Sequence, residues 1–150
     1  MRNVLVLSSL LLALAGSACS PTLAPLYAPA ETAGVSPSGT PYNAAQIDAA
    51  AVGGAQAKGW TVISHAPGLT VAEVSSGGHT ARVRILTNAS GWRVVHEQSS
   101  PGLKYGTDER HGEVIHRRYN HWVRLLDDAI RQQLSLQSAG GPAEVAPPVP

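Results

Sequence analysis

Residues 115–131 read IHRRYNHWVRLLDDAIR, and this stretch has the clearest pattern in the chain. At 100° per residue, its apolar side chains fall within about 100° of one another, and the charged side chains cluster on the opposite side. We therefore predict an amphipathic helix of about 24 residues, ending before Gly140, that packs against the fold by its apolar face. The apolar positions are Ile115, Tyr119, Trp122, Val123, Leu126 and Ile130, and the opposite positions are Arg117, His121, Arg124, Asp128 and Arg131.

Four segments that precede this helix favour β-strands. Residues 80–86 show the cleanest alternation, with Ala81, Val83 and Ile85 on one side and polar residues on the other. Such alternation is typical of an antiparallel sheet with one buried face. Turn residues, among them the SSGG at 75–78, separate the four segments. The predicted strands are 60–64, 69–74, 80–86 and 92–98.

A further helix is predicted ahead of the strands. Asn43 and Gln46 have the spacing of a capping box, and residues 47–58 follow before a stop at Gly59. The side expected to pack consists of Ile47, Ala50, Ala51, Gly54 and Ala57. Helix, four-stranded antiparallel meander, helix is an α+β order, and we expect both helices to cover one face of the sheet.

The segments on either side of this predicted compact domain, residues 42–137, are rich in Pro, Ala, Ser, Thr and Gly. Residues 20–41 (SPTLAPLYAPAETAGVSPSGTP) have no helical or strand periodicity, so residues 19–41 are predicted to form a disordered linker. As a flexible coil it would span roughly 25 to 30 Å. Residues 138–150 end in PPVP and are predicted to be a disordered tail.

Composition limits the choice of partner. The chain of 150 residues carries 11 Lys plus Arg against 10 Asp plus Glu, a formal net charge of +1. So small an imbalance does not indicate a nucleic-acid partner. The chain has one cysteine, which excludes an internal disulfide.

Residues 1–18 have the pattern of a secretory signal peptide. Arg2 is followed by an apolar run at 4–14, which is shorter than the roughly 20 residues that span a bilayer as a helix. The run leads through AGSA at 15–18 to Cys19, the single cysteine. An ordinary signal peptide cut after Ala18, leaving a free thiol on Cys19, is the alternative interpretation.

The residues leading into Cys19 resemble the lipobox of bacterial lipoproteins. The resemblance implies cleavage before Cys19, diacylation of its thiol and acylation of the new amino terminus. Two or more acyl chains hold a protein stably on a membrane, so the membrane is a predicted partner through this lipid. Ser20, rather than Asp, follows the cysteine, and by the same resemblance this favours the periplasmic face of the outer membrane in a Gram-negative envelope.

The C-terminal helix carries a second resemblance. Ile115-His116, Tyr119-Asn120 and Trp122-Val123, followed by Leu126 and Ile130, resemble a pattern shared by a group of small proteobacterial lipoproteins. The similarity covers residues 46–134. It implies a lipoprotein of the same fold and supplies no activity, because the group has none assigned.

The same helix carries the candidate contacts. His116 and Asn120 are four residues apart at the edge of the apolar face, so they could bond each other or a loop carbonyl while the Tyr119 ring packs inward. These groups either recognise a partner or fix the helix on the sheet and the 99–112 loop. The candidate partner or ligand contacts are His116, Arg117, Tyr119, Asn120 and Arg124.

A basic stripe also runs along this helix. Arg117, His121, Arg124 and Arg131 could meet anionic lipid phosphates near the membrane. Two aspartates dilute the stripe, and the i,i+4 spacing predicts the pairs Arg124–Asp128 and Asp127–Arg131. We therefore interpret this side of the helix as a solvated face.

Neither a metal nor a cofactor is predicted. His111, His116 and His121 are spaced by five residues, which places neighbours about 140° apart on a helix, and no nucleophile motif is present. We expect a non-enzymatic binding module in the periplasm with an envelope protein as its partner. The alternatives are a small envelope hydrolase that uses His116 with the 99–112 loop, or a small-ligand carrier.

Overall fold

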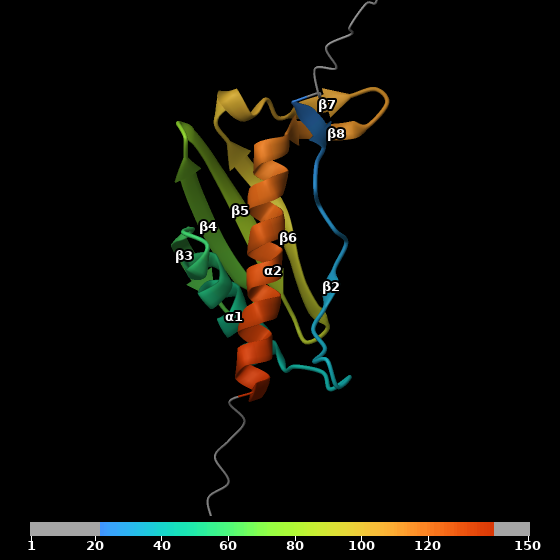
Figure 1. Ribbon diagram of the computed structural model, residues 1–150, viewed down its shortest axis with the longest axis vertical. Coiled ribbons are helices and arrows are strands. Elements are labelled where there is room, and N and C mark those ends of the chain that lie inside the picture. The colour runs from blue at the N-terminus through green and yellow to red at the C-terminus, as the bar shows by residue number, and fades with distance from the viewer. Residues whose placement is uncertain (1–21, 140–150) are drawn as a thin grey trace, which may run out of the picture.

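The strands form two antiparallel sheets, and both α-helices lie on one face of the larger sheet (Figure 1). The computed structural model describes residues 22–139. In spatial order the larger sheet contains β2 (Thr32–Ala33), β6 (Gly91–Ser99), β5 (His79–Thr87), β4 (Leu69–Ser76) and β3 (Thr61–Ala66). The smaller sheet contains β1 (Leu23–Pro25), β8 (Gly112–His116) and β7 (Gly106–Asp108). The helices are α1 (Ala44–Ala57) and α2 (Arg117–Ala139), and a short 3-10 turn, η1, covers Pro101–Leu103.

The α+β class and the run of four antiparallel strands are confirmed. Strands β3 to β6 neighbour one another in chain order, and Gly77 and Gly78, with φ of +57° and +76°, form the two-residue turn between β4 and β5. Two-residue hairpin turns need positive φ, which glycine adopts without strain. The prediction of a single four-stranded sheet is wrong, because β2 adds a fifth strand and a second sheet forms beside the first.

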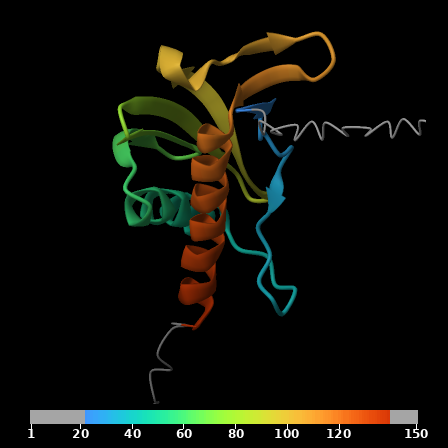
Figure 2. The same ribbon diagram turned by 45° about the horizontal axis from the view of Figure 1, so that its top comes forward.

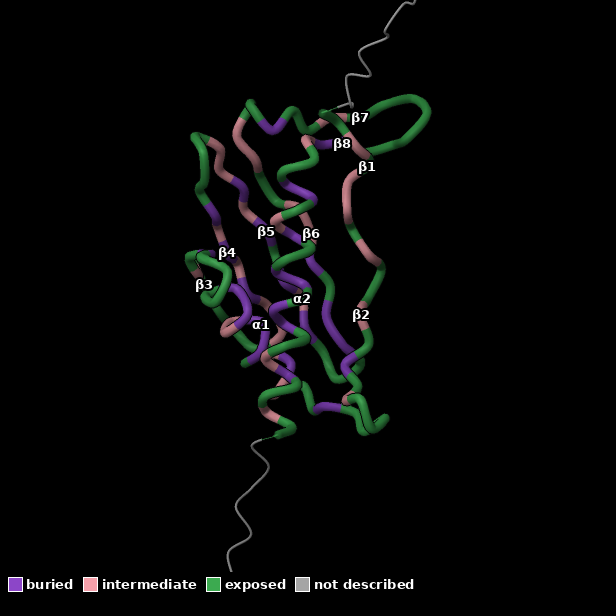
Figure 3. The backbone as a smooth tube through the Cα atoms, in the orientation of Figure 1, coloured by how far each residue is buried: buried purple, intermediate pink, exposed green. Residues whose placement is uncertain are grey.

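The core lies between the inner face of the meander and the helices (Figure 3). Ala81, Val83 and Ile85 of β5 are fully buried, as their alternation predicts. From α2, the apolar side chains that join this core are those of Tyr119, Val123, Leu126, Ile130 and Leu134. Each fully buried Val, Leu or Ile side chain contributes about 1.5–3 kcal/mol, so this layer is the main source of stability.

Helix α1 begins with the predicted capping box. Asn43 Oδ1 accepts a hydrogen bond from the Gln46 backbone N–H at 2.9 Å, and Gln46 Oε1 accepts one from the Asn43 N–H at 3.0 Å. The predicted packing face is correct except at one position, because Ala57 is exposed and Ala55 is buried in its place. Gly54 lies where α1 crosses α2 most closely.

The segment predicted as a disordered linker is ordered from Thr22 onward, so that prediction is wrong. We call residues 22–42 the strap. The strap pairs through β1 with β8 and through β2 with β6, and it runs alongside α2 (Figure 2). At the second pairing a Cβ on Gly91 would collide with the Thr32 carbonyl, so only glycine allows this approach. Backbone pairing needs no periodic side-chain pattern, which is why the strap sequence looks structureless.

The 99–112 segment, expected to be a loop, also contributes structure. It contains η1 and β7, and β8 then leads directly into α2. Ile115 and His116 therefore belong to a strand, and the helix begins at Arg117. The predicted signal peptide, Cys19 and the residues beyond 139 lie outside the described residues. Neither described helix has the length and apolar character required to cross a membrane.

Candidate functional site

Two of the predicted contact residues, Asn120 and Arg124, hold the strap. Asn120 is 2% exposed, and its Oδ1 accepts from the Tyr27 backbone N–H at 2.9 Å while its Nδ2 donates to the Pro25 carbonyl at 2.8 Å. The Arg124 guanidinium lies 4.5 Å from the centre of the Tyr27 ring, a cation–π arrangement. Asn120 therefore bonds neither His116 nor a carbonyl of the 99–112 loop, and its partners belong to the strap.

Arg117 stands where the strap begins. Its backbone N–H donates to the Thr22 carbonyl at 2.9 Å, and its side chain is exposed. The guanidinium forms no ion pair with any residue between 22 and 139. Arg117 thus remains a candidate for an external anion.

His116 ends β8 and caps α2. Its Nδ1 accepts from the Arg118 backbone N–H at 3.1 Å, which places the imidazole proton on Nε2. Its ring stacks against that of His79 with centroids 6.3 Å apart. Partial burial, with Arg118, His79 and Lys104 nearby, lowers the pKa of His116 from its ordinary 6.5. Satisfying an orphan N–H at a helix start is a structural role.

Tyr119 packs inward as predicted. It is 1% exposed, its ring meets the edge of His96 at 5.3 Å between centroids, and His96 in turn stacks on Tyr105 at 4.1 Å. Burial raises the pKa of the Tyr119 hydroxyl and lowers that of His96. The structure therefore separates the predicted cluster, with Tyr119 in the core, His116 at the helix start and Asn120 under the strap.

Asp127 is a buried carboxylate, so the interpretation of a solvated helix face is wrong at this position, although the basic stripe itself (Arg117, His121, Arg124 and Arg131) is exposed. Asp127 is 1% exposed. Its Oδ1 accepts from Trp92 Nε1 at 2.7 Å, and its Oδ2 lies 2.7 Å from Arg131 Nη2. The predicted Asp127–Arg131 pair is thus confirmed. Among the described residues the predicted Arg124–Asp128 pair does not form, and Asp128 instead bonds Arg131.

The strap also reaches Asp127 and explains its burial. The Tyr27 hydroxyl and Thr32 Oγ1 each lie 3.4 Å from its carboxylate oxygens. Burial and the Asp127 charge raise the pKa of the Tyr27 hydroxyl. The only sequence signal for this cluster was the i,i+4 spacing to Arg131, because Trp92 and Tyr27 are distant in the chain.

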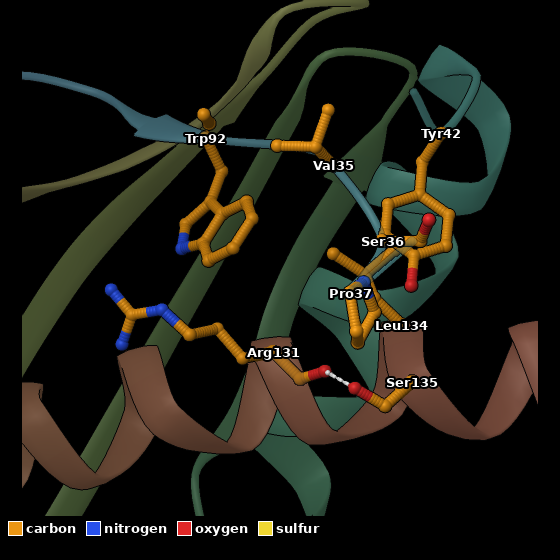
Figure 4. Close-up of a pocket in the computed structure, with 9 residues that line it drawn as sticks. Val35, Ser36, Pro37, Tyr42, Trp92, Arg131, Leu134 and Ser135 are labelled. Atoms are coloured by element: carbon orange, nitrogen blue, oxygen red, sulfur yellow. Dashed lines mark hydrogen bonds between the residues drawn. The ribbon is translucent and has the colours of Figure 1, made fainter. Parts of the chain in front are cut away.

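A surface pocket of about 270 Å³ opens beside this cluster, between the strap and the second half of α2 (Figure 4). Trp92 and Tyr42 border it from the sheet side and the strap, and Arg131 borders it from α2 (Figure 4). Val35 is 49% exposed at its rim. The pocket combines an apolar wall with the Arg131 guanidinium. Such a pocket suits an apolar side chain of a partner that has a hydrogen-bond acceptor close to it.

One His–carboxylate–hydroxyl chain exists in the described part of the molecule, and it does not involve His116. His65 Nε2 lies 3.3 Å from Asp48 Oδ2, and His65 Nδ1 lies 3.0 Å from Thr70 Oγ1. Asp48 also accepts from the Thr87 hydroxyl at 2.8 Å. Thr70 is 0% exposed, so its hydroxyl cannot reach a substrate. This series of side-chain contacts connects α1 to the β3–β4 hairpin.

Within residues 22–139, the His, Asp and Glu side chains form no group of three or more suited to a metal ion. Comparison of the chain with protein-family models, with curated proteins and with solved structures finds no match.

Proposed function

We propose that this protein is a lipid-anchored lipoprotein of the cell envelope whose domain acts as a non-enzymatic binding module. The observation that carries the proposal is the sequence before Cys19: one basic residue, a short apolar run and four small residues. Similarity to the small proteobacterial lipoproteins described above is consistent with it. By the same resemblance, the outer membrane is the proposed location.

The arrangement of titratable groups supports a binding role over hydrolysis. His116 uses Nδ1 to cap α2, and the His65 chain ends on a buried threonine. A hydrolase needs a nucleophile, a base and space for a reacting atom beside them. A carrier needs a concave, mostly apolar site that buries its ligand, whereas the Trp92 pocket has Arg131 and two serines in its lining.

Metabolic labelling with a fatty-acid probe tests the anchor. The wild-type chain is expected to take up the probe and to remain with the membrane after a high-salt wash. Cys19→Ala should take up no probe and should retain its signal peptide, so it migrates as a larger precursor. Ser20→Asp is the matched control, because it keeps the acylated cysteine and should move the protein to the inner-membrane fraction. Uptake of the probe by Cys19→Ala, or processing of this variant to the wild-type size, would contradict the proposal.

Site-specific photocrosslinking tests the binding module. A photoreactive residue at Val35, beside the Trp92 pocket, is expected to give one discrete adduct with an envelope protein in intact cells. The same residue at Arg93, on the exposed outer face of the sheet, is the control. Equal adduct patterns from both positions would rule out the pocket as the binding site.

A further inference from the structure

We propose that one end of the domain lies directly against phospholipid headgroups of the membrane that holds the lipid anchor. This end consists of β1, the β7–β8 hairpin and the first turn of α2, and we call it the anchor-proximal end. The inference rests on the proposed acylation of Cys19. It adds an orientation and a lipid-contact surface to that function.

The reach of the chain between Cys19 and the domain carries the argument. Thr22 is the first described residue, and it is three residues after Cys19. An extended chain advances at most about 3.6 Å per residue, so the two Cα atoms lie within about 11 Å of each other. The headgroup layer on each side of a bilayer is only about 5 to 8 Å thick. An acylated Cys19 therefore leaves no room for a gap between the bilayer and the residues around Thr22.

The strap cannot act as a slack leash while it stays docked. Thr22 is fixed by the Arg117 backbone N–H at 2.9 Å, and Leu23 to Pro25 pair with β8. Further along the strap, the Leu26 N–H donates to the Glu113 carbonyl at 2.8 Å, and Asn120 makes two hydrogen bonds to strap backbone. The 25 to 30 Å reach expected of a flexible linker is thus reduced to the three residues before Thr22.

The surface of the anchor-proximal end suits a headgroup layer. Leu23 is 38% exposed beside a pocket of about 340 Å³, whose lining includes Val114, Arg117 and the paired His111 and Asp108. Arg117 forms no ion pair with a described residue. An apolar side chain beside this guanidinium group matches the boundary between acyl chains and phosphates.

This orientation directs the opposite end of the domain into the periplasm. Helix α2 has 23 residues, so it is about 35 Å long. Leu134 of the Trp92 pocket lies 17 residues after Arg117, about 25 Å along the axis. The pocket proposed for a protein partner is thereby held away from the bilayer, where a partner can reach it.

Fluorescence quenching on vesicles tests the orientation. Acylation occupies the Cys19 thiol, so a second cysteine in the lipidated protein reacts alone with a maleimide dye. Arg110→Cys places the dye at the tip of the β7–β8 hairpin. Gln132→Cys places it on the exposed side of α2, about 22 Å along the helix axis from Arg117. Both proteins are reconstituted in phosphatidylethanolamine and phosphatidylglycerol vesicles that contain a lipid with a headgroup-level quencher.

Quenching should be at least about twofold stronger at position 110, because only that dye lies near the headgroups. Equal quenching at the two positions, or stronger quenching at 132, would overturn the orientation. Failure of the proposed function has a different signature: dye would label wild-type Cys19, and the protein would not stay with the vesicles. Circular dichroism identical to wild type shows that both variants are folded.

Discussion

Asn120 is the residue on which docking of the strap depends most directly, since it is buried and bonded twice to strap backbone. Asn120→Ala leaves the Pro25 carbonyl and the Tyr27 N–H without their partner. We expect the free energy of unfolding to fall by about 1–3 kcal/mol, measured by chemical denaturation. Amide exchange at Tyr27 should also accelerate. Gln132→Ala, on the exposed side of α2, is the control and should change stability by no more than about 0.5 kcal/mol.

His116 makes the start of α2 sensitive to pH. Only the neutral imidazole accepts the Arg118 N–H, and the folded pKa of His116 lies below its ordinary 6.5. The unfolded chain therefore binds the proton more readily, so this contribution to stability is present above pH 6.5 and is lost as the pH falls through the folded pKa. Half-buried His96, whose pKa is also lowered, acts in the same direction.

The variant His116→Asn separates the two histidines. Asparagine keeps a side-chain acceptor at the helix start but does not titrate. Denaturation at pH 7.5 and pH 5.5 should therefore show a smaller loss of stability on acidification for His116→Asn than for wild type. An equal loss in both proteins would assign the pH dependence to His96 and other groups.

At the scale of elements, the crossing of α1 and α2 depends on Gly54. A Cβ there would lie 2.9 Å from Ile130 Cγ1 and from the Ile130 backbone nitrogen. Replacing Gly by Ala in a helix interior normally raises the free energy of unfolding by about 1 kcal/mol. Here the collision with Ile130 makes the same replacement destabilising. Gly54→Ala should lower the free energy of unfolding by about 1–3 kcal/mol.

Gly53 is the matched control for this crossing. A Cβ at Gly53 would meet only the flexible Gln133 side chain, with Oε1 at 3.3 Å. Gly53→Ala is therefore expected to be neutral or to raise the melting temperature. Thermal unfolding followed by circular dichroism compares the two variants, and equal shifts would show that a Cβ at position 54 does not collide with Ile130.

For the molecule as a whole, the orientation that we propose on the membrane depends on the distance between Cys19 and Thr22. Inserting a flexible Gly/Ser linker of about 20 residues between Pro21 and Thr22 would add roughly 25 Å of reach. The linker leaves every described contact intact, so the melting temperature should not change. Quenching of the dye at position 110 should fall toward that at position 132. Undiminished quenching would show that chain reach is not what holds this end to the lipid.

The sequence predicted well which residues of the helices and strands face the core. The meander and both helices carry strict two-residue or 3.6-residue patterns, because half of each element faces the core. The apolar face of α2 was correct at Tyr119, Val123, Leu126 and Ile130. The helix start was misplaced by two residues, because Ile115 and His116 continue the apolar pattern while belonging to β8.

The polar cluster under the strap could not be predicted in the same way. Asn120 and Asp127 fall outside the apolar side of α2, so periodicity assigns them to solvent or to the edge of the helix. The strap covers that side by pairing its backbone with β8 and β6, and such pairing leaves no pattern in its own sequence. Trp92 and Tyr27 reach Asp127 across 35 and 100 residues of chain.

The sequence by itself determined the periodic core, and it predicts the export signal and the single acylation candidate, because these features depend on neighbouring residues. The tertiary structure alone decided that residues 22–42 are held against α2, since contacts between distant segments depend on the assembled fold. Because this docking already holds Thr22, only three residues along the chain separate the proposed acylation site at Cys19 from the docked strap, in place of the predicted leash of residues 19–41.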